Sequence, residues 1–184
     1  MLWAIPIGIV VGALVGGRTD GLVAMHFRWA ALAVGGLLVQ VALFTPFGDQ
    51  LAGGFGPAIY VLSTAAVLVA VLRNLGLTGM PIVGLGALSN LAAVIANGGS
   101  MPADPAALAA AGLGGPGEHT NSVVLADPAL RPLTDIFAVP AWLPLANVFS
   151  VGDVLIGVGI VVVIVAAMRR GAEPSPPATE SAAP

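Results

Sequence analysis

The sequence predicts an all-α membrane protein, a five-helix transmembrane bundle with a long extracytoplasmic loop before the last helix. Three observations predict this fold: the apolar composition, five long apolar segments, and the distribution of arginine along the chain. Of the 184 residues, 58% are hydrophobic and only 8% are charged. Because a soluble domain carries about 25% charged residues, a chain of this composition needs a bilayer to cover its apolar surface.

The five apolar segments are each close to the roughly 17–25 residues that a helix needs to cross the hydrocarbon layer. In lipid, only helices and closed barrels satisfy their backbone hydrogen bonds, and these segments show no alternation of apolar and polar residues. Pro57 and Pro81 fall at first-turn positions, where a missing N–H costs nothing. The sequence therefore predicts transmembrane helices over residues 2–17, 29–45, 57–72, 80–97 and 151–168.

Arginine predicts the orientation of these helices. All six basic residues are arginine, and an N-terminus outside the cell places five of them on the cytoplasmic side, as the positive-inside rule requires. The five are Arg18, Arg28, Arg73, Arg169 and Arg170, with Arg131 as the exception. The first segment could also be a secretory signal peptide. Because its arginine follows the apolar stretch instead of preceding it, we expect a retained helix.

Two further regions are not membrane helices. Residues 98–150 form one long outer loop, in which Asp104 and Pro105 have the pattern of a helix start and Gly112 that of its end. Loops of this length are usually functional or disordered. Residues 171–184 are rich in proline, alanine, serine and glutamate, and we expect a disordered cytoplasmic tail.

The composition excludes several classes of function. The chain has no cysteine, which excludes disulfides and thiolate chemistry. His26 and His119 fall on opposite sides of the membrane, so we expect no metal site, and no cofactor is indicated. Six arginines without a basic stripe argue against nucleic acid as a partner. A channel or carrier is disfavoured because the helices contain no buried charge. The lipid bilayer is the one expected partner, and the sequence indicates no oligomeric state.

Polar side chains within membrane helices are functional candidates by default. Asn90 and Asn97 are seven residues apart and share one helix face, so together with Ser150 we consider them candidates for binding a substrate. The alternative for Gln40 and Asn90 is a hydrogen bond between helices. The alternative for Asn97 is a bond to the backbone of the glycine-rich turn that it opens.

Two acids are candidates for catalysis. Asp135 and Asp153 bracket a Pro- and Trp-containing segment that could fold back at the outer membrane surface and bring the two carboxyl groups together. Facing carboxyl groups share a proton and can activate water for hydrolysis. Each acid also has a structural alternative. Ser150 and Asp153 have the spacing of a helix capping box, and Asp135 could be an exposed loop acid beside Arg131.

Two motifs resemble those of a bacterial family of small multi-pass membrane proteins that is known as a domain of unknown function. They are residues 97–102 (Asn-Gly-Gly-Ser-Met-Pro) and residues 149–156 (Phe-Ser-Val-Gly-Asp-Val-Leu-Ile). The resemblance implies a membrane location and no particular activity.

A remoter similarity, over about residues 58–168, is to signal peptidase II, the aspartyl lipoprotein signal peptidase. Residues 86–91 (Gly-Ala-Leu-Ser-Asn-Leu), 133–136 (Leu-Thr-Asp-Ile) and 149–153 resemble three of its motifs. The resemblance implies that Asp135 and Asp153 are the catalytic pair on the extracytoplasmic side, and that the ligand is lipid- or lipoprotein-like. Ser150 stands where that family has asparagine, and an Asp-Arg pair of that family is absent near Val94.

Two functions therefore remain open. The sequence slightly favours a non-enzymatic membrane protein that binds a ligand or scaffolds an assembly. The alternative is an aspartyl hydrolase that uses Asp135 and Asp153 at the outer membrane face.

Overall fold

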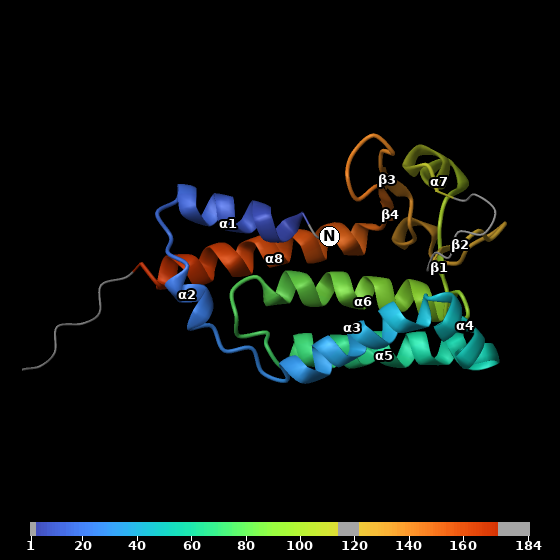
Figure 1. Ribbon diagram of the computed structural model, residues 1–184, viewed down its shortest axis with the longest axis horizontal. Helices are drawn as coiled ribbons and strands as arrows, with labels where there is room; N and C mark the ends of the chain where they lie inside the picture. Colours follow the sequence, from blue (N-terminus) through green and yellow to red (C-terminus); the bar gives the residue numbers. More distant parts are fainter. Residues whose placement is uncertain (1–2, 114–121, 173–184) are drawn as a thin grey trace, which may run out of the picture.

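A computed structural model describes residues 3–113 and 122–172, and this part of the chain is mostly helical. Five long helices run along the long axis of the molecule (Figure 1). They are α1 (Ala4–Leu14), α3 (Ala30–Leu43), α5 (Gly56–Leu72), α6 (Met80–Ala96) and α8 (Val151–Arg170). The helical character of all five predicted apolar segments is confirmed, with bounds close to the predicted ones. The predicted tail from residue 173 onward and His119 lie outside the described residues.

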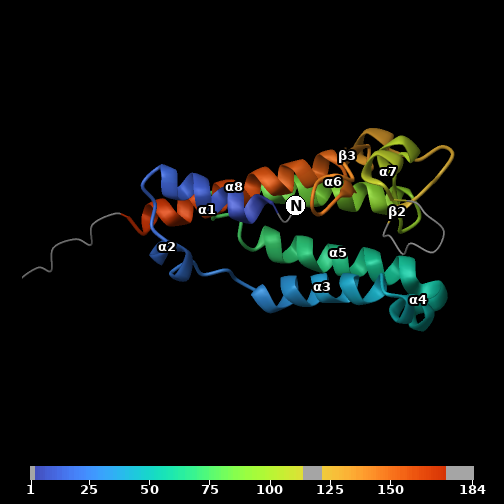
Figure 2. The same cartoon turned by 45° about the horizontal axis from the view of Figure 1, so that its top comes forward.

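The helices pack as a chain of neighbours. Helix α8 contacts α1 on one side and α6 on the other, while α6 contacts α5, and α5 contacts α3. Figure 2 shows the result: α3 and α5 lie together on one side of the molecule, and α1 and α8 lie together on the other. Gln40 of α3 donates a hydrogen bond to Thr64 Oγ1 of α5 at 3.3 Å, so its predicted role as a link between helices is confirmed.

Glycines bring α6 and α8 close together. A Cβ atom on Gly86 would meet the carbonyl oxygen of Gly152, and one on Gly159 would lie 3.0 Å from the carbonyl oxygen of Gly79. Gly79 and Gly86 are seven residues apart, as are Gly152 and Gly159. Because seven residues make about two helical turns, each pair lies on one face of its helix. Small residues at such positions let the helix backbones approach closely, as in the interfaces of membrane helices.

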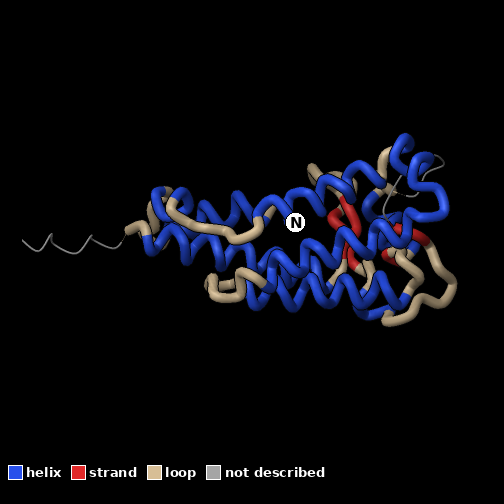
Figure 3. The backbone as a smooth tube through the Cα atoms, turned by 90° about the horizontal axis from the view of Figure 1, so that it is seen from below, coloured by secondary structure: helices blue, strands red, loops and turns tan. Residues whose placement is uncertain are grey.

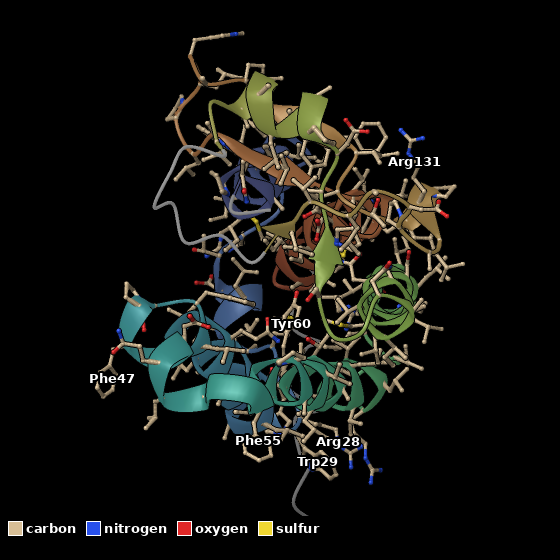
Figure 4. The ribbon with its side chains drawn as sticks, turned by 90° about the vertical axis from the view of Figure 1, so that its right-hand side faces the viewer. Arg28, Trp29, Phe47, Phe55, Tyr60 and Arg131 are labelled. Carbon is tan, nitrogen blue, oxygen red and sulfur yellow. The ribbon has the colours of Figure 1, made fainter. Side chains whose placement is uncertain are left out.

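Helical structure also occurs outside the five long helices. Helix α4 (Pro46–Ala52) and the 3-10 turn η1 (Gly53–Phe55) precede α5 and join it in one helical stretch, while α2 (Asp20–Val23) follows α1. The sequence did not predict α4, although Thr45 caps it by accepting a hydrogen bond from Gly48 N at 3.0 Å. Viewed along the long axis, α4 lies at the ends of α3 and α5 (Figure 4).

Residues 98–113 and 122–150 form a small loop subdomain at one end of the molecule (Figure 1). Its helix α7 (Pro105–Ala111) is capped by Asp104 and ends at Gly112, whose φ is +69°, as predicted. Two pairs of short strands, which the sequence did not predict, complete it (Figure 3). Strand β1 (Met101–Pro102) pairs in parallel with β2 (Ser122–Val123), and β3 (Phe137–Val139) pairs antiparallel with β4 (Asn147–Phe149). The 3-10 turn η2 (Arg131–Leu133) lies between the two pairs in the chain.

Two helical stretches among the described residues are long and apolar enough to cross a membrane. They are Pro46–Leu72, with 27 residues, and Val151–Arg170, with 20 residues. Helices α1, α3 and α6 are also apolar but shorter than this.

Candidate functional site

A polar cavity of about 210 Å³ lies between α3, α5, α6 and α8 and is bordered by residues of the loop subdomain. Both candidate acids, Asp135 and Asp153, line it, although they come from different elements of the structure. Its lining combines the two aspartates with Gln40, Tyr60, Thr64, Asn90 and Asn147 and with apolar residues, and among the described residues no basic one lines it. The segment between the two acids folds back through the antiparallel pairing of β3 with β4, whereas direct contact between the two carboxyl groups stays a prediction.

Asp135 is held by the backbone of the loop subdomain. Its N–H donates to the carbonyl of Pro102 at 2.9 Å, and its own carbonyl accepts from Asp104 N at 2.9 Å. The residue is only 4% exposed. The alternative of an exposed loop acid beside Arg131 is therefore wrong: Asp135 is buried by its pairing with the strand segment at residues 102–104, and Arg131 pairs with Asp104 instead, at 3.1 Å.

Asp153 lies in the first turn of α8 and takes part in a capping box. Ser150 Oγ accepts a hydrogen bond from Asp153 N at 3.0 Å, and Asp153 Oδ2 accepts one from Ser150 N at 3.0 Å. The structural alternative for this acid is thus confirmed. The cap does not account for the whole carboxylate, because Oδ1 faces α6 and accepts from Asn90 Nδ2 at 2.9 Å.

Asn90 connects the two ends of this cap. Ser150 Oγ donates to Asn90 Oδ1 at 2.8 Å, while the amide nitrogen of Asn90 donates to Asp153. The three side chains therefore form a closed network between α6 and α8, which holds the Asp153 carboxylate in one orientation. The structure brings together two predicted substrate-binding residues, Asn90 and Ser150, whose side chains form hydrogen bonds with Asp153 and with each other.

Asn97 lies outside the lining of this cavity. Its side-chain oxygen accepts from Ala129 N at 2.9 Å, and its amide nitrogen donates to the carbonyls of Ala129, at 2.9 Å, and Ala93, at 2.8 Å. The residue thus ties the end of α6 to the loop subdomain through backbone groups, in keeping with the alternative of backbone bonding. Its predicted contact with a substrate has no support in this arrangement.

Residues 24–165 match a family described as a family of unknown function (DUF5317). The chain belongs to this family. The matched region holds every residue that lines the polar cavity, whereas α1 precedes it. No curated protein and no solved structure matches the chain.

Two residues of this DUF5317 chain were missed by sequence reasoning. A Cβ atom at Gly152 would overlap Asn90 Oδ1, so only glycine there lets the asparagine reach Ser150 and Asp153. Tyr60 of α5 points toward the interior of the molecule (Figure 4), where it lines the cavity and packs edge-on against the ring of Phe44. The position of Gly152 between a capping serine and its aspartate was a sequence signal that could have identified this glycine. For Tyr60 the sequence offered none.

A second, apolar cavity adjoins the same acid. It has a volume of about 530 Å³ and lies between α1, α8 and the β3–β4 pair, lined by residues such as Trp3, Ile7, Phe149 and Val158. Asp153 lines this cavity as well as the polar one. An apolar molecule bound along α8 would therefore end beside the carboxylate.

The described residues offer no evident metal site, because they contain no group of three or more histidine, cysteine, aspartate or glutamate side chains placed to hold an ion. The chemistry available in the polar cavity is that of two carboxyl groups, a phenol, amides and a hydroxyl group. This set is suited to proton transfer and hydrogen bonding.

Proposed function

We propose that this chain is a bacterial inner-membrane protein that crosses the bilayer five times, with its N-terminus outside and its C-terminus in the cytoplasm. Large apolar side chains on the outer faces of the helices support the proposal, since Val41 is 67% exposed, Leu62 70% and Leu85 59%. A monomer in water rarely exposes so much contiguous apolar surface. The arginines follow the same division, because only Arg131 belongs to the loop subdomain.

We also propose that the polar cavity is the active site of an aspartyl hydrolase at the outer membrane face. The observation that carries this proposal is that Asp135 and Asp153 line one cavity. In this proposal one of the two carboxyl groups acts as the base that activates water, and the other acts as the acid that protonates the substrate carbonyl. The shared cavity favours this function over the non-enzymatic role that the sequence slightly favoured.

The reaction needs one proton on the pair and one water molecule. The ionised carboxylate takes a proton from water as the oxygen attacks the carbonyl carbon of a peptide bond, and the protonated acid donates its proton to the carbonyl oxygen. When the tetrahedral intermediate collapses, the C–N bond breaks and the leaving nitrogen takes the proton from the carboxyl group that had deprotonated the water. At the same time one hydroxyl group of the intermediate gives its proton back to the other carboxylate as the carbonyl of the product forms. One proton then remains on the pair, which is ready for another cycle.

The network around Asp153 supports this mechanism. Asn90 and Ser150 are positioning residues in this proposal, because they direct the Asp153 carboxylate without a place in the proton transfers. The apolar cavity along α8 would present a lipid- or lipoprotein-like substrate to Asp153 from the bilayer. Asp135 would meet the same bond from the side of the loop subdomain.

A non-enzymatic role stays as the second candidate, because both oxygens of Asp153 already accept hydrogen bonds. A cavity with two acids and no basic lining residue would also bind a protonated amine. In that case a simple alkylamine raises the melting temperature of the purified wild-type protein but not that of an Asp135→Asn variant.

Comparing the N-termini of membrane proteins tests the hydrolase. Cells that lack the gene are complemented with the wild type, Asp135→Asn or Asp153→Asn, and new N-termini are mapped by mass spectrometry. Some new N-termini should appear only in cells that carry the wild type. We expect their abundance to fall at least about 100-fold with either variant, because removing one member of a proton-transferring pair lowers the reaction rate by about 10²–10⁴. Asparagine keeps the shape of the side chain and its ability to cap a helix.

Asp49→Asn is the matched control, since Asp49 is an acid beside the same end of the helices that does not line the polar cavity. It should leave the pattern of N-termini unchanged. Equal patterns from the wild type and both cavity variants, with all proteins inserted and folded, would rule out the enzymatic function.

A further inference from the structure

The opposite end of the molecule carries a third cavity, of about 470 Å³, which the proposed hydrolysis does not use. It lies between α2, the turn that joins α5 to α6, and the last turns of α8. Figure 1 shows these three segments together at the end remote from the loop subdomain. Four polar side chains line the cavity: Asp20, His26, Thr78 and Arg170.

The lining of this cavity holds one basic side chain, Arg170, and one acidic side chain, Asp20, which forms an ion pair with Arg18. The carboxylate of Asp20 is engaged by Arg18, whose Nε and Nη2 atoms donate to it at 3.1 and 3.0 Å. Arg170 donates from Nη2 to Thr78 Oγ1 at 3.0 Å, and among the described residues it forms no ion pair. A guanidinium held by a hydroxyl keeps further N–H donors for an anion. Phosphate is the anion that such a fork fits best.

The rest of the lining is apolar. Met25, Leu77, Val163 and Ala167 form a floor beneath the charged rim. A free phosphate ion has no apolar group that could contact these residues, whereas a phospholipid carries its first methylene groups beside its phosphate. The size of the cavity also exceeds what a single phosphate group fills.

Close packing holds the walls of the cavity in place. A Cβ atom at Gly21 of α2 would overlap the carbonyl oxygen of Ala167 in α8, so the two helices touch through their backbones. The N–H of Arg18 donates to the carbonyl of Met168 at 2.9 Å, which fixes the start of the same segment. The site is therefore already built before a ligand arrives.

We propose that this cavity binds the phosphate of an anionic phospholipid, with Arg170 as the principal contact and His26 and Thr78 at its rim. Basic pockets between helices on the cytoplasmic side of a membrane are suited to such head groups. The proposal rests on the membrane orientation proposed above and is independent of any hydrolytic activity. Its failure would leave the roles of Asp135 and Asp153 untouched.

Native mass spectrometry of the purified full-length protein in detergent tests the proposal, with phosphatidylglycerol as the probe. We expect Arg170→Gln to weaken binding about fivefold, since a basic residue near anionic lipid contributes about 1 kcal/mol. Arg169→Gln is the matched control, because the adjacent arginine carries the same charge but does not line the cavity. Binding by this control should stay within about twofold of the wild type.

Other probes distinguish the source of the phosphate. Phosphatidylcholine, which carries the same phosphate without net charge, should bind more weakly than phosphatidylglycerol. Equal losses from Arg169→Gln and Arg170→Gln would overturn the site, because they would show a general effect of surface charge. Competition by millimolar inorganic phosphate that displaces the lipid completely would overturn the lipid as the ligand and leave free phosphate in its place.

Discussion

At the scale of single residues, the arrangement of the polar cavity depends on a glycine, Gly152. Gly152 lies between the serine and the aspartate of the α8 capping box, and its bare Cα makes room for the amide of Asn90. Asn90 thereby reaches across from α6 and binds both Ser150 and Asp153. The hydrogen bonds from Asn90 and from the capping box together hold the Asp153 carboxylate in one orientation.

Gly152→Ala should break this network, because the added methyl group would overlap Asn90 Oδ1. We expect a loss of about 1–3 kcal/mol in the free energy of unfolding, as for other overpacked sites, together with a loss of any activity. Thermal unfolding in detergent measures the first effect and mapping of N-termini the second. Gly157→Ala on the same helix is the control, since its nearest neighbour there would be 3.9 Å away. A Gly152→Ala protein as stable as this control would contradict the account.

At the scale of elements, the clearest local determinants are helix caps. Thr45, Asp104 and Ser150 each accept a hydrogen bond from a backbone N–H in the first turn of the helix that follows. Such caps satisfy donors that have no partner within the helix. They fix where α4, α7 and α8 begin, and so they place the segments that carry the cavity.

Asp104 makes the cap of α7 sensitive to pH. The hydrogen bond from Ala106 N, and then the one from Arg131, hold the pKa of this carboxyl below its ordinary value of 3.8. Because the folded state lowers the pKa, the stabilisation is present above about pH 3.8 and is lost as the pH falls through the folded value.

Asp104→Ala should therefore lower the melting temperature at neutral pH, and its difference from the wild type should shrink below pH 3.8. Melting curves followed by fluorescence between pH 3 and 7 would check this. Asp127→Ala, which removes another acid of the same subdomain that caps no helix, should show no such trend. A constant difference across the whole range would contradict an electrostatic role for Asp104.

At the scale of the whole molecule, the structure has two chemically different ends. One end carries the loop subdomain with Asp104, Asp127 and Asp135, and the other carries five of the six arginines together with Asp20. The apolar helix faces between them support a bilayer as the medium around the middle. Helix α1 has 11 residues, or about 16 Å at 1.5 Å per residue. Its crossing is therefore the part of the topology that most needs a direct test.

The absence of cysteine makes this test simple, because single cysteines can be introduced without background labelling. In intact cells, a membrane-impermeant maleimide should label Trp142→Cys and Trp3→Cys but not Gly76→Cys. All three positions are exposed, so accessibility depends on the side of the membrane. Inside-out vesicles should reverse the pattern. Labelling of Gly76→Cys from outside would overturn the orientation, and an unlabelled Trp3→Cys would overturn the crossing of α1.

The sequence alone predicted the five long helices, because apolar runs and first-turn prolines act locally and need no partner. It also predicted α7 through Asp104 and Gly112, and the cap at Ser150 and Asp153 through their spacing. The short strands and α4 were not predicted. Strands of two or three residues carry too little pattern to be recognised, and each exists only because a distant segment pairs with it.

The candidate site was decided by tertiary structure. The spacing of Asp135 and Asp153 allowed them to meet, but local propensities do not determine how a loop folds back over helix ends. The pairing of Asp135 with Pro102 and Asp104, and the glycine contact between α6 and α8, bring the acids to one cavity. These contacts join residues far apart in the chain, so only the packed molecule could show that Asn97 stays outside the cavity while Tyr60 lines it.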